Sequence, residues 1–260
     1  MRIFTFKNFR ILLLLIVLAG VALYSKDQRL VTQGWYKPLH VVIYPINADN
    51  SPEVTRYIES LTVKNFDSID EFIIRESKKY DIATSTPTII TLGETVTNLP
   101  PKPPGPDANP IRIMLWSLKL RWWTNKNTPD NESNKYRVRI FVLFHETGVD
   151  KKLEHSLGLQ KGLLGIVHAF ASKKQSKQNN IVIAHELLHT VGASDKYDQF
   201  GNPIGPDGLA DPNLSPIYPQ KNAEIMAGTV ALTASNSKMA ISLKKCVVGE
   251  KTAIEIGWLK

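Results

Sequence analysis

The residues best suited to chemistry lie in one stretch, Ala184 to Asp198, which reads AHELLHTVGASDKYD. It carries His185 and His189 four residues apart, with Glu186 directly after the first histidine. Histidines at this spacing lie on one face of a helix, one turn apart, so both imidazoles can reach one metal ion. The alternative is a helix that carries two unrelated histidines at its surface or in the core.

A glycine and an aspartate follow the second histidine. Gly192 can adopt the left-handed conformation that ends a helix, which would turn the chain so that Asp195 comes back toward the metal. Asp198 competes for the role of third ligand. Apolar residues recur at intervals of three and four on the opposite side of the predicted helix and would pack it onto a sheet. They are Ile181, Ala184, Leu188 and Val191.

Two neutral nitrogens and one carboxylate leave the fourth position of a zinc ion open for water, which is typical of a catalytic site. Zinc lowers the pKa of bound water from about 15.7 to about 7. Glu186 would accept the proton of that water and pass it to the leaving amine. Because an accidental HExxH pattern occurs in roughly one chain in a hundred of this length, the helix, the glycine and the carboxylate together favour a metal site.

The stretch HELLHTVGASD resembles the extended zinc signature HExxHxxGxxH/D of the metzincin metallopeptidases, in the variant with an aspartate as third ligand. The resemblance implies that His185, His189 and Asp195 bind zinc and that Glu186 is the general base of an endopeptidase. It also implies an α+β fold with a twisted mixed sheet, an antiparallel edge strand, backing helices and a zinc-binding helix. An irregular C-terminal subdomain would begin at about residue 196.

Three further expectations come from the same resemblance. Met226 in AEIMAG is the candidate for the methionine that metzincins place in a tight turn beneath the metal, and GIVHAFA, residues 165–171, is the candidate for the edge strand that binds substrate. Some metzincins carry a tyrosine two residues after the methionine, where this chain has Gly228. Tyr197 and Tyr218 are the candidate replacements.

The N-terminus has the pattern of an export signal. Three basic residues and no acidic residue precede the apolar run from Ile11 to Tyr24. Residues 1–25 are therefore predicted to be a signal peptide or a single N-terminal membrane anchor, with a buried helix as the alternative. Residues 26–260 would form an exported, periplasmic or extracellular catalytic domain.

Composition limits the remaining possibilities. The chain has 260 residues, 43% of them hydrophobic, and a net charge of +8, so it can bury a full core. No nucleic-acid-binding motif is present. The single cysteine, Cys246, excludes an internal disulfide and a thiolate metal site. Asp198, Asp207 and Asp211 could hold calcium in the turn-rich stretch after the predicted zinc helix, but they lack the spacing of a calcium loop, and a surface loop is the alternative.

Periodicity predicts the other elements. In 111–123, Ile111, Leu115, Leu118 and Trp122 recur at helical spacing, with a strand as the alternative, and the Trp122-Trp123 pair is expected to pack in the core. The remaining assignments are strands at 40–47, 86–96, 136–144 and 162–172, helices at 51–61, 66–82 and 179–192, irregular loops at 100–110 and 198–220, and a helical C-terminus from about Leu232.

Two hypotheses for the function follow. The first is an exported zinc endopeptidase that acts on polypeptides and is held at a membrane by its N-terminal apolar segment. The second is a non-catalytic, zinc-containing envelope protein for binding or assembly, in which the zinc helix is only a scaffold. The sequence assigns no function to His145 or His168 and does not predict an oligomeric state.

Overall fold

A five-stranded sheet forms the centre of the protein. The computed structural model describes residues 6–105, 107–128, 137–148 and 152–260. The strands follow the order β2-β1-β3-β5-β4; the first four are parallel and β4 is antiparallel to β5. Their bounds are Leu39–Asn47 for β1, Thr88–Leu92 for β2, Val138–His145 for β3, Leu157–Leu159 for β4 and Leu164–Phe170 for β5. A mixed sheet with helices confirms the predicted α+β class.

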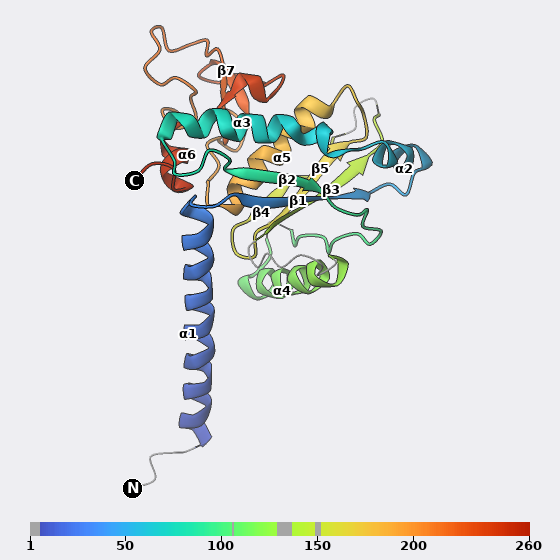
Figure 1. Cartoon of the computed structure of the whole chain (residues 1–260), viewed down its shortest axis with the longest axis vertical. Coiled ribbons are helices and arrows are strands. Elements are labelled where there is room, and N and C mark those ends of the chain that lie inside the picture. The colour runs from blue at the N-terminus through green and yellow to red at the C-terminus, as the bar shows by residue number, and fades with distance from the viewer. Residues whose placement is uncertain (1–5, 106, 129–136, 149–151) are drawn as a thin grey trace.

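Both faces of this sheet are covered by helices, as Figure 1 shows. Helices α2 (Pro52–Glu59), α3 (Asp67–Ser77) and α5 (Ser176–Thr190) pack on one face, and α4 (Pro110–Asn127) packs on the other. Because side chains alternate along a strand, Val41 and Ile43 enter the first core while Val42 and Tyr44 enter the second. Burial on both sides explains why these strands read as continuous apolar runs.

The predicted helices begin where their caps indicate. Ser51 accepts a hydrogen bond from the Glu53 backbone at the start of α2, and Asn109 accepts one from the Arg112 backbone at the start of α4. The segment 111–123 is therefore a helix and not a strand. Two short 3-10 helices, η1 (Val63–Phe66) and η2 (Lys78–Tyr80), flank α3. In the described part of the predicted loops 100–110 and 198–220, the one helical residue is Pro110, where α4 begins.

The prediction for the edge strand was wrong in its position. GIVHAFA forms most of β5, which lies inside the sheet and is parallel to β3. The antiparallel edge strand is β4, which has only three residues. A strand with neighbours on both sides and cores above and below is mostly apolar, as GIVHAFA is except for His168. Three residues are too few to show an alternating pattern, so β4 left no signal in the sequence.

The prediction of a helical C-terminus was also wrong. The segment begins in β7 (Thr229–Thr233), which forms a hairpin with β8 (Asn236–Met239). It continues through the 3-10 helix η3 (Leu243–Lys245) and β9 (Cys246–Val247), which pairs with the earlier strand β6 (Ala223–Glu224), and it contains only one short helix, α6 (Glu250–Glu255). Serine, threonine and asparagine are dense from Thr233 to Ser242, and these residues favour turns and strands over helix interiors.

The N-terminal apolar segment forms a single helix, α1 (Phe6–Gln33), that projects from the body (Figure 1). It is long and apolar enough to cross a membrane, and the side chains of its apolar run are exposed. The helix continues without a break past residue 25. Its last turns pack on the body, where Gln28 donates a hydrogen bond to the Gln160 carbonyl at 2.6 Å. Such a helix is compatible with a signal peptide or a membrane anchor.

Candidate metal centre

The structure brings His185, His189 and Asp195 together at one point. The Nε2 atoms of the two histidines are 3.0 Å apart, and each lies 3.1 Å from Oδ1 of Asp195. Both histidines lie on α5 one turn apart, and Asp195 comes from the loop that follows. Among the described residues, this is the one group of His, Cys, Asp and Glu side chains that could hold a metal ion.

Backbone carbonyls fix the orientation of both imidazoles. Nδ1 of His185 donates to the Ile225 carbonyl at 2.9 Å, and Nδ1 of His189 donates to the Ala193 carbonyl at 2.8 Å. A carbonyl oxygen can only accept, so the proton of each neutral ring is on Nδ1 and the lone pair of each Nε2 points to the common centre. This arrangement of a bound second nitrogen is typical of histidines that ligate metals.

The three potential ligand atoms are placed to fit a small cation. Three acceptor atoms about 3 Å apart repel one another unless a positive charge lies between them. Ligands of a tetrahedral zinc ion at about 2.0–2.2 Å are separated by about 3.3 Å, close to the spacing observed. The site therefore has the ligand types and spacing of a metal centre.

Gly192 turns the chain at the end of α5. Its φ angle is +111°, a conformation that glycine adopts without the cost that a side chain would add. A Cβ atom there would lie 2.6 Å from Nε2 of Gln33, the last residue of α1. That nitrogen donates to the carbonyls of Val191 at 2.6 Å and Glu255 at 2.9 Å. The turn is thus held from outside by the end of the projecting helix.

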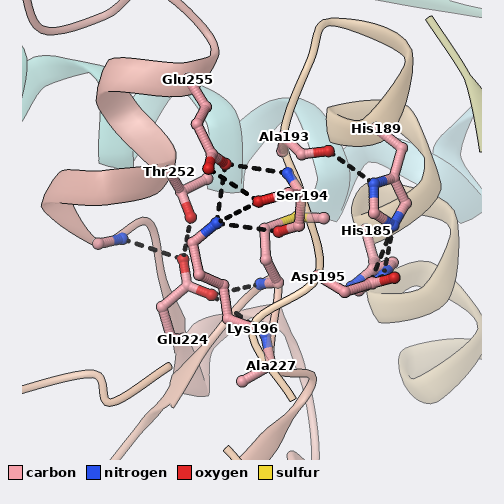
Figure 2. A network of polar contacts seen from close by, with 12 residues as sticks. His185, His189, Ala193, Ser194, Asp195, Lys196, Glu224, Ala227, Thr252 and Glu255 are labelled. Carbon is pink, nitrogen blue, oxygen red and sulfur yellow. Dashed lines mark hydrogen bonds and ion pairs between the residues drawn. The ribbon is translucent and has the colours of Figure 1, made fainter. Parts of the chain in front are cut away.

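Both neighbours of Asp195 are bound to a single carboxylate, that of Glu255 in α6, as Figure 2 shows. Ser194 donates to it through its backbone at 2.9 Å and its hydroxyl at 2.8 Å, and the Lys196 ammonium donates to it at 2.7 Å. Burial raises the pKa of Glu255, but these bonds lower it further than burial raises it. The contacts hold the loop on both sides of Asp195.

Met226 lies fully buried in a tight turn after β6. The carbonyl before it, that of Ile225, binds His185, and its own carbonyl accepts the Lys196 backbone N–H at 3.0 Å. The turn therefore binds the side chain of one ligand, His185, and the backbone of Lys196, which follows the ligand Asp195. This is the place in the chain where the resemblance puts a methionine turn.

A buried carboxylate, that of Glu224, holds this turn (Figure 2). One of its oxygens accepts the backbone N–H groups of Met226 and Ala227, and the other accepts that of Gly249 at 3.2 Å and the Thr252 hydroxyl at 2.8 Å. Burial raises the pKa of Glu224, although the hydrogen bonds from Thr252, Gly249 and Met226 lower it in part. The carboxylate has donors on both oxygens.

Glu224→Gln is expected to destabilise the protein by roughly 2–4 kcal/mol, because the glutamine amide would place a donor against donors and leave buried N–H groups unpaired. Urea unfolding followed by circular dichroism measures the change. Glu250→Gln, an exposed substitution on α6, is the matched control and should shift the unfolding free energy by less than about 0.5 kcal/mol. Equal stability of the two variants would show that the Glu224 contacts contribute little.

Glu186 follows His185 on α5, and its Oε2 atom is buried without a hydrogen-bond partner among the described residues. Burial raises the pKa of Glu186, His185 and His189 lower it, and Asp195 raises it. Glu186 borders a cleft of about 380 Å³. The cleft is also lined by His168, by Gln175 just before α5 and by Tyr197 after it. A carboxylate oxygen buried without a partner, next to the candidate metal ligands and the cleft, needs a ligand or an ordered water to satisfy it.

The edge strand β4 lies directly against the site because its central residue is a glycine. A Cβ atom on Gly158 would lie 2.5 Å from the carbonyl oxygen of Glu186 and 2.5 Å from Cβ of His189. Such a contact cannot be relieved by turning a side chain, since one partner is helix backbone. Gly158 therefore sets the separation of the edge strand from α5.

Gly158→Ala is expected to push β4 away from α5 and to lower the unfolding free energy by about 1–3 kcal/mol. Because the site would be displaced, the rate of any reaction there should fall by about tenfold or more. Gly165→Ala is the matched control: Gly165 pairs with Gly158 across the sheet, and its added methyl would meet the Ile140 side chain instead. Chemical unfolding and the rate of peptide cleavage measure both variants. A Gly158→Ala protein with the stability and turnover of the wild type would contradict the packing argument.

Other residues considered from the sequence fall in different places. Tyr197 lines the cleft, and burial and the neighbouring carboxylates raise its pKa to about 12. Tyr218 is not among the residues that line this cleft. His168 lines the cleft, and its Nδ1 atom lies 2.9 Å from Nε2 of His145. Nδ1 of His145 lies 2.9 Å from Oδ1 of Asp49.

The acidic residues after the helix do not join the metal cluster. Asp198 accepts the backbone N–H groups of Phe200 and Asn202, and Asp211 accepts that of Asn213. These bonds shape local turns, as expected for a surface loop. Asp207 likewise lies outside the group of possible ligands found among the described residues.

Sequence reasoning missed the residues that hold the site: Gln33, Gly158, Lys196, Glu224 and Glu255. Only Glu224 left a local signal, because it is an acidic residue inside the otherwise uncharged segment AEIMAG. The others act through contacts between segments far apart in the chain, such as Lys196 with Glu255.

Comparison with known proteins adds no assignment: the chain matches no family model, and no curated protein is significantly similar to it.

Proposed function

We propose that this protein is a zinc-dependent endopeptidase with a metzincin-like fold. The observation that carries the proposal is the combination of three converging acceptor atoms with an unpaired, buried carboxylate oxygen on the adjacent residue. A purely structural metal site needs the ligands but gives no reason to bury Glu186 beside them without a partner. The mixed sheet with an antiparallel edge strand next to the site supports the same fold.

The chain's own residues have distinct roles in this mechanism. His185, His189 and Asp195 hold the ion, which when bound would activate water and polarise the scissile carbonyl. Glu186 takes a proton from the attacking water and donates it to the leaving amine. Burial of Glu186 raises its pKa toward the working pH, which suits a group that must both accept and release a proton.

The edge strand β4 is the proposed binding site for the polypeptide substrate. Its inner side pairs with β5, and its position at the edge of the sheet leaves its outer side for an added strand. Gly158 places this strand against Glu186, so a substrate paired with β4 would pass close to the carboxylate. Tyr197 is the candidate for a further hydrogen-bond donor in the cleft.

The proposed location is outside the cytoplasm, with α1 as a membrane anchor or an export signal. The length and apolar surface of α1 support an inserted helix. The basic residues before the apolar run would remain on the cytoplasmic side and the body would lie on the other.

Metal analysis and peptide cleavage by the full chain in detergent test the proposal. We expect one zinc ion per chain and cleavage of a peptide library at internal bonds, lost with a chelator and restored by zinc. A protein that binds zinc at one ion per chain and cuts no peptide would contradict the peptidase assignment. It would favour the non-catalytic envelope protein, for which binding of a partner to the β4 edge should survive Glu186→Gln.

A further inference from the structure

Helix α4 has apolar residues on both of its faces. Leu120 and Trp123 on the inner face pack in the second core, where Trp123 lies edge-on to Phe141. The large side chains of the outer face are exposed, and Trp122 is 64% exposed, so only one member of the tryptophan pair is in the core as predicted. The exposed residues, here called the outer face of α4, are Ile111, Met114, Leu115, Leu118 and Trp122. Contiguous exposed apolar residues of this kind mark an interaction surface.

Basic residues surround the outer face of α4. The helix contains four of them and no acidic residue. The Lys126 ammonium lies 5.4 Å from the ring centroid of Trp122, at the rim of the face. An apolar stripe with tryptophan, bordered by lysine and arginine, is typical of helices that lie in the headgroup region of a membrane with anionic lipids. The basic residues are Arg112, Lys119, Arg121 and Lys126.

The position of α4 relative to α1 points to the same partner. In Figure 1, α4 lies on the side of the sheet toward which α1 extends. The axis of α4 runs across that of α1, and α4 is level with the half of α1 nearest the body. One turn of the chain joins the two helices: Gln28 of α1 donates to the Gln160 carbonyl at 2.6 Å, and Arg121 of α4 donates to the Lys161 carbonyl at 2.9 Å. Gln28 is the first buried residue of α1, and it follows shortly after the apolar run ends at Tyr24.

We propose that α4 is an interfacial helix, which rests its outer face in the surface of the same bilayer that α1 spans and binds anionic lipid headgroups through its basic residues. When the apolar run of α1 occupies the hydrocarbon layer, the boundary of that layer lies at the level of α4. A second copy of the chain fits this surface less well, since a symmetric contact would bring the basic rims together. The proposal requires α1 to be inserted and is independent of peptidase activity.

Two points of attachment have a mechanical consequence. A body held by α1 alone can rotate about the helix axis, whereas contact through α4 fixes its orientation relative to the membrane plane. The cleft beside Glu186 would then open in one direction with respect to the bilayer, at a fixed height above it.

Site-directed spin labelling of the full chain in vesicles tests the proposal. The single native thiol, Cys246, is buried and its pKa is raised to about 12, so an introduced cysteine is labelled selectively. Leu118→Cys reports on the outer face of α4, Leu14→Cys on α1, and Ile241→Cys is the matched control, because Ile241 is an equally apolar exposed residue. It follows β8, whose partner β7 lies on the far side of the body from α1 (Figure 1).

In vesicles of phosphatidylcholine and phosphatidylglycerol, the label at 118 should be more accessible to oxygen than to a water-soluble nickel complex, as should the label at 14, and the label at 241 should show the opposite. A water-exposed label at 118 with a lipid-exposed label at 14 would overturn the proposal and leave the anchor intact. Dipolar broadening between labels at 118 would show that a second copy covers the face, which would also overturn it.

The lipid charge is tested separately. Replacing Lys119 and Lys126 by glutamine should make the label at 118 more water-exposed, and so should vesicles of phosphatidylcholine alone, because attraction to the headgroups is lost in both cases. If the label at 118 were equally immersed in lipid under all these conditions, the assignment of anionic lipid as the partner would be overturned. Both lysine side chains are exposed, so the variant should fold like the wild type.

Discussion

Glu186→Gln is expected to lower kcat by roughly 10²–10⁴-fold while zinc content and fold stay unchanged. Glutamine has nearly the shape of glutamate and can occupy the same buried position, but its amide cannot accept a proton. The metal ligands do not depend on the Glu186 side chain, since Nδ1 of each histidine is bound by a backbone carbonyl. Rates of peptide cleavage, together with metal analysis of the same samples, measure the effect.

Glu71→Gln is the matched control for this substitution, because Glu71 is an exposed glutamate on α3, away from the cleft. We expect its kcat to equal that of the wild type. If Glu186→Gln kept full activity with zinc bound, another group would have to accept the proton, and the role assigned here to Glu186 would be wrong. If it lost zinc as well as activity, the experiment would show that Glu186 acts on the metal and not on the proton.

Asp195→Ala is expected to remove both the metal and the activity. Without the carboxylate, two neutral nitrogens remain, and the ion loses the one anionic ligand of the cluster. The wild type should be stabilised by about 2.7 kcal/mol when free zinc is about a hundred times its Kd. For a chain of this size that corresponds to a rise in Tm of roughly 5–10 °C, which the variant should lack. Zinc titration followed by differential scanning calorimetry measures the shift.

Asp198→Ala provides the comparison, because Asp198 competed for the ligand role in the sequence and lies three residues further on. Its carboxylate accepts two backbone N–H groups of its own loop, so we expect some loss of stability but one zinc ion per chain. Zinc binding that survives in Asp195→Ala and fails in Asp198→Ala would exchange the two assignments. Equal zinc-induced shifts in Tm for the wild type and both variants would argue against a metal site at this cluster.

Local patterns were enough to predict the arrangement of the candidate ligands. His185 and His189 share a helix face because of their spacing, and Gly192 takes the positive φ angle that the turn toward Asp195 requires. Caps such as Ser51 and Asn109 gave the starts of two helices for the same reason. In each case the determining interactions lie within a few residues of one another, which is the range over which a sequence pattern carries information.

Features that depend on distant contacts were not predictable in the same way. Which strand lies at the edge of the sheet depends on the pairing of Leu157–Leu159 with β5, and a three-residue strand has no period. The C-terminal segment was assigned as helix from about Leu232, yet its strands form by pairing, β8 with β7 and β9 with β6. The exposure of Trp122 likewise depends on which side of α4 meets the sheet.

The bond from Ser194 to Glu255 joins residues 61 positions apart, so the loop that carries Asp195 can be held in place only after that later segment has been made and folded. Until that segment has folded, the loop with Asp195 lacks the bonds that Ser194 and Lys196 make to Glu255. We therefore expect the candidate metal centre to assemble late in folding. If the centre is hydrolytic, as proposed, a nascent chain could not cut itself or its neighbours before synthesis is complete.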